Sequence, residues 1–258
     1  MTVVSPPTVA LIVSEDGLFM SRFVGGAMSV LGPLGVHVLL RPAGEPFDGA
    51  LIATLDPGDD GPRRLVEAGV PVVLFGRPAE PLPISFVDID HQAAGKLAAD
   101  RLVDHGCRCI ATIAGPLNLP GGHDRLAAFR AAMAHRGIAY VPCVEGRSTL
   151  ASGSRAMEQL LDEVPDVDGI FVASDLMAQG ALLVLRERGR RVPADIIVVG
   201  FDDSRAALAS RPPLTTIRQP VEEMAAEMAR LLLARLDGPH SRTRSVIFPP
   251  TLVQRLSA

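Results

Sequence analysis

Short apolar runs recur along the chain, and longer segments with apolar residues at helical spacing separate them. An apolar run without polar alternation is typical of a strand buried on both faces, as in a parallel sheet covered by helices. The alternation of such runs with helical segments therefore predicts an α/β fold with parallel sheets. The clearest runs lie at residues 9–13, 49–53, 70–75, 109–114, 169–173 and 196–199.

The number of predicted strands is too large for a single sheet of the mononucleotide-binding type. Two similar lobes explain the number, each with a first strand, a capped helix and a ligand-binding edge facing the other lobe. Asp90 is expected to cap the helix that opens the second lobe. We therefore predict two Rossmann-like lobes.

One connection in the first lobe is unusually short. The strands predicted at residues 35–40 and 49–53 are separated by only eight residues, RPAGEPFD. Parallel strands normally need a crossover of about a dozen residues, most often a helix. Our hypothesis is that residues 41–48 cross the sheet in extended form and leave a patch of the first lobe uncovered or covered by a partner.

Two adjacent carboxylates follow the strongest apolar run. The run at residues 196–199 leads directly into Gly200, Phe201, Asp202 and Asp203. Ligands of open α/β sheets bind at the carboxyl ends of the strands, whereas an Asp before a helix often caps it. We expect one Asp to cap the helix near Ser204 and the other to bind a ligand.

A basic side chain is predicted near the same edge. The Gly-rich loop at residues 115–124 precedes a helix that is expected to begin at Arg125. A guanidinium there can donate a forked pair of hydrogen bonds to hydroxyl or carboxylate groups, although long charged side chains more often face solvent. One acceptor and one forked donor would suit a sugar or nucleobase-like ligand.

Composition narrows the class of protein. A net charge of −4 argues against a nucleic-acid-binding surface over the whole chain, and no apolar run approaches the length of a membrane span. The N-terminus lacks a signal-peptide pattern, and three cysteines, Cys107, Cys109 and Cys143, fit a reducing compartment. We therefore expect a cytoplasmic protein without membrane contacts.

The sequence contains no recognisable catalytic or cofactor-binding set. The patterns G-x-S-x-G, H-E-x-x-H and G-x-x-x-x-G-K-[ST] are absent, and no G-x-G-x-x-G follows the first strand. The spacing Cys107-Arg-Cys109 is not that of a zinc finger. We therefore expect neither an enzyme nor a cofactor nor a metal site.

Several longer sequence segments occur in an order that is typical of one protein family. From about residue 8 to the C-terminus, the chain resembles the LacI/GalR family of bacterial transcription regulators. The resemblance implies a type I periplasmic-binding-protein-like fold whose lobes are joined by a three-stranded hinge. The matching words are VDIDHQAAGKLAADRLVDHGCRCIATIAGP, SDLMAQGALLVLRERG, VPADIIVVGFDDS and PPLTTIRQP.

The resemblance also implies how the lobes divide the chain. Residues 8–89 and 220–245 would form the N-terminal lobe, and residues 90–219 and 246–258 the C-terminal lobe. The hinge would lie near residues 88–90, 218–220 and 246–249. The N-terminal helix-turn-helix of the family is absent from this chain, so operator DNA would be contacted only through a domain not present here.

The resemblance assigns roles to particular residues. Arg125, in the word Arg-Leu-Ala-Ala-Phe, and Asp202 would contact the effector, and Ser174 stands where the family usually has Asn. Asp175 is expected to cap the next helix as readily as to bind ligand. Weaker candidates for the ligand site are Ser148 and, on the first lobe, Asp16, Leu18, Phe19 and Phe75, although a core role is the default for Phe.

The function implied by these observations is effector sensing. A small molecule would bind in the cleft between the lobes and shift the DNA binding of a homodimer. The alternatives are a solute-binding protein of a sugar transporter, which would need an export signal or lipid anchor, and an α/β enzyme, which would need a catalytic set.

Overall fold

The computed structural model describes residues 6–13, 17–53, 58–238 and 242–258, and in residues 17 and 18 only the backbone. The chain forms two compact units, which are considered separately. The first extends to Ile89 and includes Pro220–Phe248; the second contains Asp90–Gln219 and Pro249–Ala258. The chain thus passes between the units three times, after Ile89, Gln219 and Phe248. None of the helices in the described residues is both long and apolar enough to cross a membrane.

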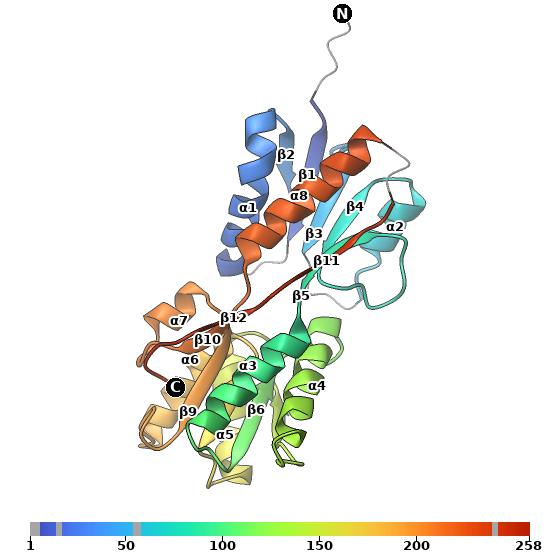
Figure 1. Cartoon of the computed structure of the whole chain (residues 1–258). Helices are drawn as coiled ribbons and strands as arrows, with labels where there is room; N and C mark the ends of the chain where they lie inside the picture. The colour runs from blue at the N-terminus through green and yellow to red at the C-terminus, as the bar shows by residue number, and fades with distance from the viewer. Residues whose placement is uncertain (1–5, 14–16, 54–57, 239–241) are drawn as a thin grey trace, which may run out of the picture. The chain divides into compact units, whose positions relative to one another are not determined.

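The first unit is built on a six-stranded sheet in the order β11-β5-β4-β3-β1-β2, with every neighbouring pair parallel. In the described residues of this unit, three α-helices and one 3-10 turn, Gly32–Leu34, lie beside the sheet. The three helices are labelled in Figure 1. The strands are β1 (Thr8–Val13), β2 (His37–Leu40), β3 (Gly49–Ala53), β4 (Val72–Phe75), β5 (Ser85–Ile89) and β11 (Ser245–Phe248); the helices are α1 (Gly17–Leu31), α2 (Gly61–Glu67) and α8 (Val221–Asp237).

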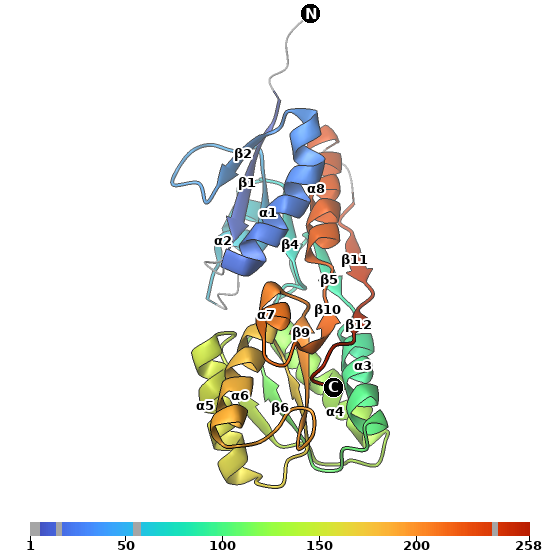
Figure 2. The ribbon, with the colours of Figure 1, turned by 90° about the vertical axis from the view of Figure 1, so that its left-hand side faces the viewer.

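Helices α1 and α8 lie side by side on one face of this sheet (Figure 2). Their close approach depends on Gly26, because a Cβ atom there would lie 2.2 Å from the carbonyl oxygen of Glu222. The opposite face has a smaller cluster of buried side chains, against which Leu65 and Val66 of α2 pack. The two faces of the first sheet are therefore covered unequally.

The absence of a helix between β2 and β3 is confirmed. Residues 41–48 contain no helical turn, and Arg41 adopts a left-handed backbone conformation with φ of 53°. The segment is tied to β1 at both ends: the Arg41 amide donates to the Leu11 carbonyl, and the Asp48 amide donates to the Thr8 carbonyl. The half-buried Phe47 packs against the smaller apolar cluster in place of a helix.

The second unit has a six-stranded sheet in the order β12-β10-β9-β8-β6-β7. Strand β12 is antiparallel to β10, and the other neighbouring pairs are parallel. The strands are β6 (Ile110–Ala114), β7 (Cys143–Glu145), β8 (Gly169–Val172), β9 (Ile197–Asp202), β10 (Thr215–Arg218) and β12 (Thr251–Val253); the helices are α3 (His91–Asp104), α4 (Pro120–Ala134), α5 (Leu150–Glu163), α6 (Asp175–Glu187) and α7 (Arg205–Ala209).

Helices cover both faces of the second sheet. Helices α3 and α4 lie on one face and α5 and α6 on the other (Figure 2). Phe129 of α4 packs on Phe171 of β8, with ring centroids 4.9 Å apart. The Asp90 carboxylate caps α3 by accepting a hydrogen bond from the Ala93 amide, as the sequence predicts.

Two predictions about the elements are wrong. Helix α4 begins at Pro120 and not at Arg125, because proline is well suited to the first helical turn and the Gly residues that follow tolerate the helix. The assignment of residues 246–258 to the second lobe fails for Val246, Ile247 and Phe248, because β11 pairs with β5 of the first sheet. An apolar strand pattern indicates that a strand exists but not which sheet it joins.

Candidate functional site

The polar residues with the strongest claim to a functional role gather at the carboxyl edge of the second sheet. Asp202 is the last residue of β9 and is partly exposed, and its backbone has φ of 114°. Asp203 follows with φ of 54°. A positive φ at a non-glycine residue costs roughly 1–3 kcal/mol and is concentrated at functional sites. The surrounding contacts therefore hold this turn in an unfavourable conformation.

Arg125 reaches the same edge from α4. Its guanidinium carbon lies 3.5 Å from the centre of the Phe201 ring, and Nη1 donates to the carbonyl oxygen of Ala173 at 2.6 Å. The ring and the carbonyl fix the guanidinium between the ends of β8 and β9. Arg125 is consequently a partly buried side chain of the strand edge rather than a surface residue of α4.

Asp203 is held by Arg255 and does not cap a helix. Both side chains are 15% exposed, and Arg255 Nη2 donates to Asp203 Oδ1. Arg255 also donates to the carbonyl oxygen of Leu214 at 2.8 Å. The cap of α7 is Ser204, whose Oγ accepts from the Ala206 amide. The prediction that one of the two aspartates caps this helix is therefore wrong.

Ser174 precedes α6 and Asp175 is its first residue, and the serine is the one that caps the helix. Ser174 Oγ accepts from the Met177 amide at 3.3 Å. The carboxylate of Asp175 is completely buried and accepts hydrogen bonds from Thr216 Oγ1 at 2.6 Å and from the Ser204 amide at 2.7 Å. The capping role considered for Asp175 is thus wrong.

The environment of Asp175 favours its protonated form. Burial is the main cause that raises the pKa of Asp175 well above the ordinary aspartate value, and the negative charge of Asp202 adds to it. The hydrogen bonds from Thr216 and Ser204 act in the opposite direction. The sequence pointed to Asp175 as a helix cap or a ligand contact but did not predict its burial, because an Asp at the start of a helix is usually an exposed cap.

Ser148 lies at the same edge but several strands away. It follows β7 with φ of 54°, beside the capping box that Thr149 and Ser152 form at the start of α5. Strand β7 is three positions from β9 in the sheet. At a strand spacing of about 4.8 Å, this places Ser148 roughly 14 Å from the end of β9. Only an elongated ligand would contact both Ser148 and Asp202.

The two aromatic site candidates of the first unit, Phe19 and Phe75, pack together. The rings of Phe19 in α1 and Phe75 at the end of β4 are 5.0 Å apart in an edge-to-face arrangement, and both pack against the core with Phe23. Asp16 lies outside the described residues, and Leu18 is placed only by its backbone in α1. The core role expected by default for phenylalanine is thus observed for Phe19 and Phe75, which are also partly exposed.

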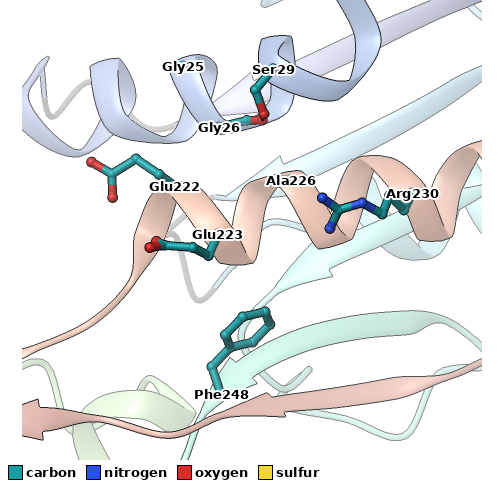
Figure 3. Close-up of a pocket in the computed structure, with 8 residues that line it drawn as sticks. All are labelled: Gly25, Gly26, Ser29, Glu222, Glu223, Ala226, Arg230 and Phe248. Atoms are coloured by element: carbon teal, nitrogen blue, oxygen red, sulfur yellow. The ribbon is translucent and has the colours of Figure 1, made fainter.

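A separate groove of about 520 Å³ lies beside α1 and α8 (Figure 3). None of the predicted site residues whose side chains the structure describes lines it. Two of its three charged side chains form ion pairs in the same unit: Glu222 with Arg22, and Arg230 with Glu227. Its lining comprises Gly25, Gly26, Ser29, Glu222, Glu223, Ala226, Arg230 and Phe248.

The two-unit fold, with an acid and a stacked arginine at a sheet edge, defines a ligand-binding core of the periplasmic-binding-protein kind. Residues 99–258 match the family described as periplasmic binding protein-like domain. The regulator CelR of Thermobifida fusca is 41% identical over 279 aligned positions, which cover 97% of this chain and 81% of CelR. The alignment is longer than the chain, so CelR contains residues that have no counterpart here.

Other similar proteins are also named as transcription regulators. The repressor CytR of Escherichia coli is 36% identical over 72% of this chain, which spans about half (55%) of CytR. The structure of a CelR–cellobiose complex is 40% identical, covers 97% of this chain and 84% of its own, and superposes with a TM-score of 0.92. A ribose-bound LacI family regulator from Enterococcus faecium is 25% identical, covers 97% and 98%, and has a TM-score of 0.86.

The chain belongs to the LacI family of transcription regulators and contains the effector-binding core of that family. The alternative of a transporter's solute-binding protein is not favoured, because the relatives are named as transcription regulators.

Proposed function

We propose that this protein senses a sugar, and that a β-linked disaccharide such as cellobiose is the first effector to test. The observation that carries the proposal is the similarity to the CelR–cellobiose complex over 97% of the chain. The proposal of a sugar over a nucleobase rests on this complex and on the ribose-bound relative.

Asp202 and Arg125 are the proposed centre of the binding site. A carboxylate accepts hydrogen bonds from adjacent sugar hydroxyls, and a guanidinium donates to their oxygens, so the pair recognises a polyhydroxyl ligand from both sides. The stacking of Arg125 on Phe201 fixes its orientation before the ligand arrives, which lowers the entropy lost on binding. Ser148, Ser174, Phe19 and Phe75 are proposed as peripheral contacts.

We infer that effector binding changes transcription by shifting a two-state equilibrium of a homodimer. The DNA would be read by a helix-turn-helix of the kind named in the relatives, and the protein would act in the cytoplasm with the DNA. Light scattering of the purified chain, with and without effector, tests the dimer. A mass equal to one chain under all conditions would contradict it.

The sugar proposal is tested by calorimetry with a panel of cellobiose, glucose, ribose, adenine and cytidine. We expect cellobiose to bind and the two nucleobase compounds not to bind. The double variant Arg125→Ala/Asp202→Ala should abolish binding. The control is Arg188→Ala/Asp162→Ala, which removes an exposed ion pair from the same unit and should bind like the unaltered protein. Tight binding of a nucleobase, or of cellobiose by the first double variant, would refute the proposal.

A further inference from the structure

The buried carboxylate of Asp175 connects the turn after β9 to strand β10. Its Oδ2 accepts from the Ser204 amide, two residues after Asp202, and its Oδ1 accepts from Thr216 in β10. Thr216 Oγ1 lies 3.4 Å from the amide of Asp203. The carboxyl group of Asp175 thus holds the backbone at Asp203 and Ser204, directly after Asp202.

The buried carboxylate lies directly against β9. A Cβ atom on Gly200 would lie 2.5 Å from Asp175 Oδ1. Glycine in β9 therefore allows the acid to lie directly against the strand that ends in Asp202. Asp175 approaches the strand from the face covered by α6, whereas Arg125 approaches the end of β9 from the face covered by α4.

The charged groups near Asp175 make its burial unfavourable, so a purely stabilising role does not explain its position. Asp202 at the end of β9 repels it, and the neighbouring Asp203 is already paired with Arg255. Strand β10 provides the hydroxyl of Thr216, and Ser204 at the start of α7 provides its backbone amide and its side chain. The guanidinium of Arg125 is engaged with Phe201 and Ala173. A buried acid beside a second acid at a ligand edge is more typical of functional sites than of structural ones.

We propose that Asp175 is a positioning residue for the effector: its carboxylate holds the turn at Asp203 and Ser204 so that Asp202 faces the ligand. The inference rests on the proposed function, because it takes Asp202 as a ligand-binding residue. Asp175 itself does not contact the effector in this scheme.

The ionised form of Asp175 performs this role. Both oxygens already accept hydrogen bonds, so a proton on either one competes with the hydroxyl of Thr216 or the amide of Ser204. As the pH falls through the pKa of Asp175, the turn loosens and effector affinity falls. A neutral sugar has no titrating group, and a pH dependence that Asp175→Asn removes therefore comes from Asp175.

The first experiment alters the hydroxyl donor and leaves the acid in place. Thr216→Val keeps the volume and removes the hydrogen bond, whereas Thr216→Ser keeps the hydroxyl. We expect cellobiose affinity, measured by calorimetry at about pH 9, to fall about tenfold in Thr216→Val and to change less than about threefold in Thr216→Ser. Equal affinities in both variants would overturn the proposal.

The second experiment needs no ligand. The amide resonance of Ser204 should shift with pH in the unaltered protein and in Asp162→Asn, an exposed control, but not in Asp175→Asn. If cellobiose fails to bind but the Ser204 amide responds in this way, the proposed effector is wrong and the positioning role stands. If cellobiose binds equally well at about pH 6 and about pH 9 and the Ser204 amide does not respond, the positioning role is wrong.

Discussion

The two sheets share one strand order, although the edge strand β11 is parallel to its neighbour and β12 is antiparallel. They differ at the connection to the third strand of each. In the second unit, β7 and β8 are joined through the 14-residue helix α5. In the first unit, β2 and β3 occupy the equivalent positions, and residues 41–48 join them without a helix. The crossover survives this loss because backbone hydrogen bonds tie both ends of the segment to β1. A helix at this position is therefore needed for covering the sheet and not for ordering its strands.

The carboxyl edges of the two sheets differ in chemistry as well. The edge of the second sheet carries Asp175, Asp202 and Arg125. Hydrogen bonds hold Asp175, and a hydrogen bond and a ring contact hold Arg125. The described part of the first edge presents Phe19 and Phe75, which are partly buried and pack on each other. The second edge thus presents directional polar groups, and the described part of the first edge presents an apolar surface.

The largest expected effect separates the two edges. Asp202→Ala should lower effector affinity about 100-fold, because a buried ligand hydroxyl loses a charged acceptor. Phe75→Leu should lower it only about fivefold, because it removes an aromatic contact and keeps apolar volume. Calorimetry with cellobiose measures both. Phe23→Leu is the matched control, since Phe23 belongs to the same ring group but is fully buried. An equal loss in Phe75→Leu and Asp202→Ala would reverse the comparison.

The second prediction concerns the pH dependence of stability. The pKa of Asp175 is raised in the native state, so between about pH 4 and that raised value the native protein holds more protons than the unfolded chain. The free energy of unfolding therefore falls as the pH rises through this window, by at most about 1.4 kcal/mol per pH unit. Above the native pKa the full cost of the buried charge is present.

Asp175→Asn removes this contribution. The unaltered protein should therefore lose stability relative to Asp175→Asn as the pH increases. Urea unfolding at a series of pH values measures the difference. A difference that is constant with pH would show that Asp175 titrates as an ordinary exposed acid.

The third prediction compares ion pairs. Arg255 and Asp203 are each 15% exposed, so Arg255→Met should leave a largely desolvated carboxylate and lower the free energy of unfolding by about 2 kcal/mol. Urea unfolding measures this loss. Arg188→Met breaks a pair whose side chains are 48% and 67% exposed and should cost less than about 0.5 kcal/mol. If the two variants lose the same stability, burial of the Arg255 pair is energetically unimportant.

The sequence indicates much of the architecture and less of the site. Apolar runs such as residues 196–199 predict the buried parallel strands, because a strand buried on both faces consists of consecutive apolar residues. The sheet that β11 joins and the short antiparallel strand β12 depend on long-range pairing, for which three or four residues carry little signal. The same limit applies to Asp175: its burial results from Gly200 and Thr216, which are 25 and 41 residues away in the sequence.

Apart from the Arg188→Met control, the smallest expected effect belongs to the ion pair between α1 and α8 in the first unit. Arg22 Nε and Nη2 donate to the two oxygens of Glu222 at 2.8 and 2.7 Å, which is the geometry of a strong bidentate pair. The Glu222 side chain is nevertheless 45% exposed, so water and salt screen the interaction. A double-mutant cycle with Arg22→Met and Glu222→Gln should give a coupling below about 1 kcal/mol that decreases with added salt. At Gly26, a Cβ atom would overlap the Glu222 backbone. Gly26→Ala should therefore lower the free energy of unfolding more than loss of the ion pair does. A coupling as large as the effect of Arg255→Met would mean that charge, and not close helix packing, holds this face of the first sheet together.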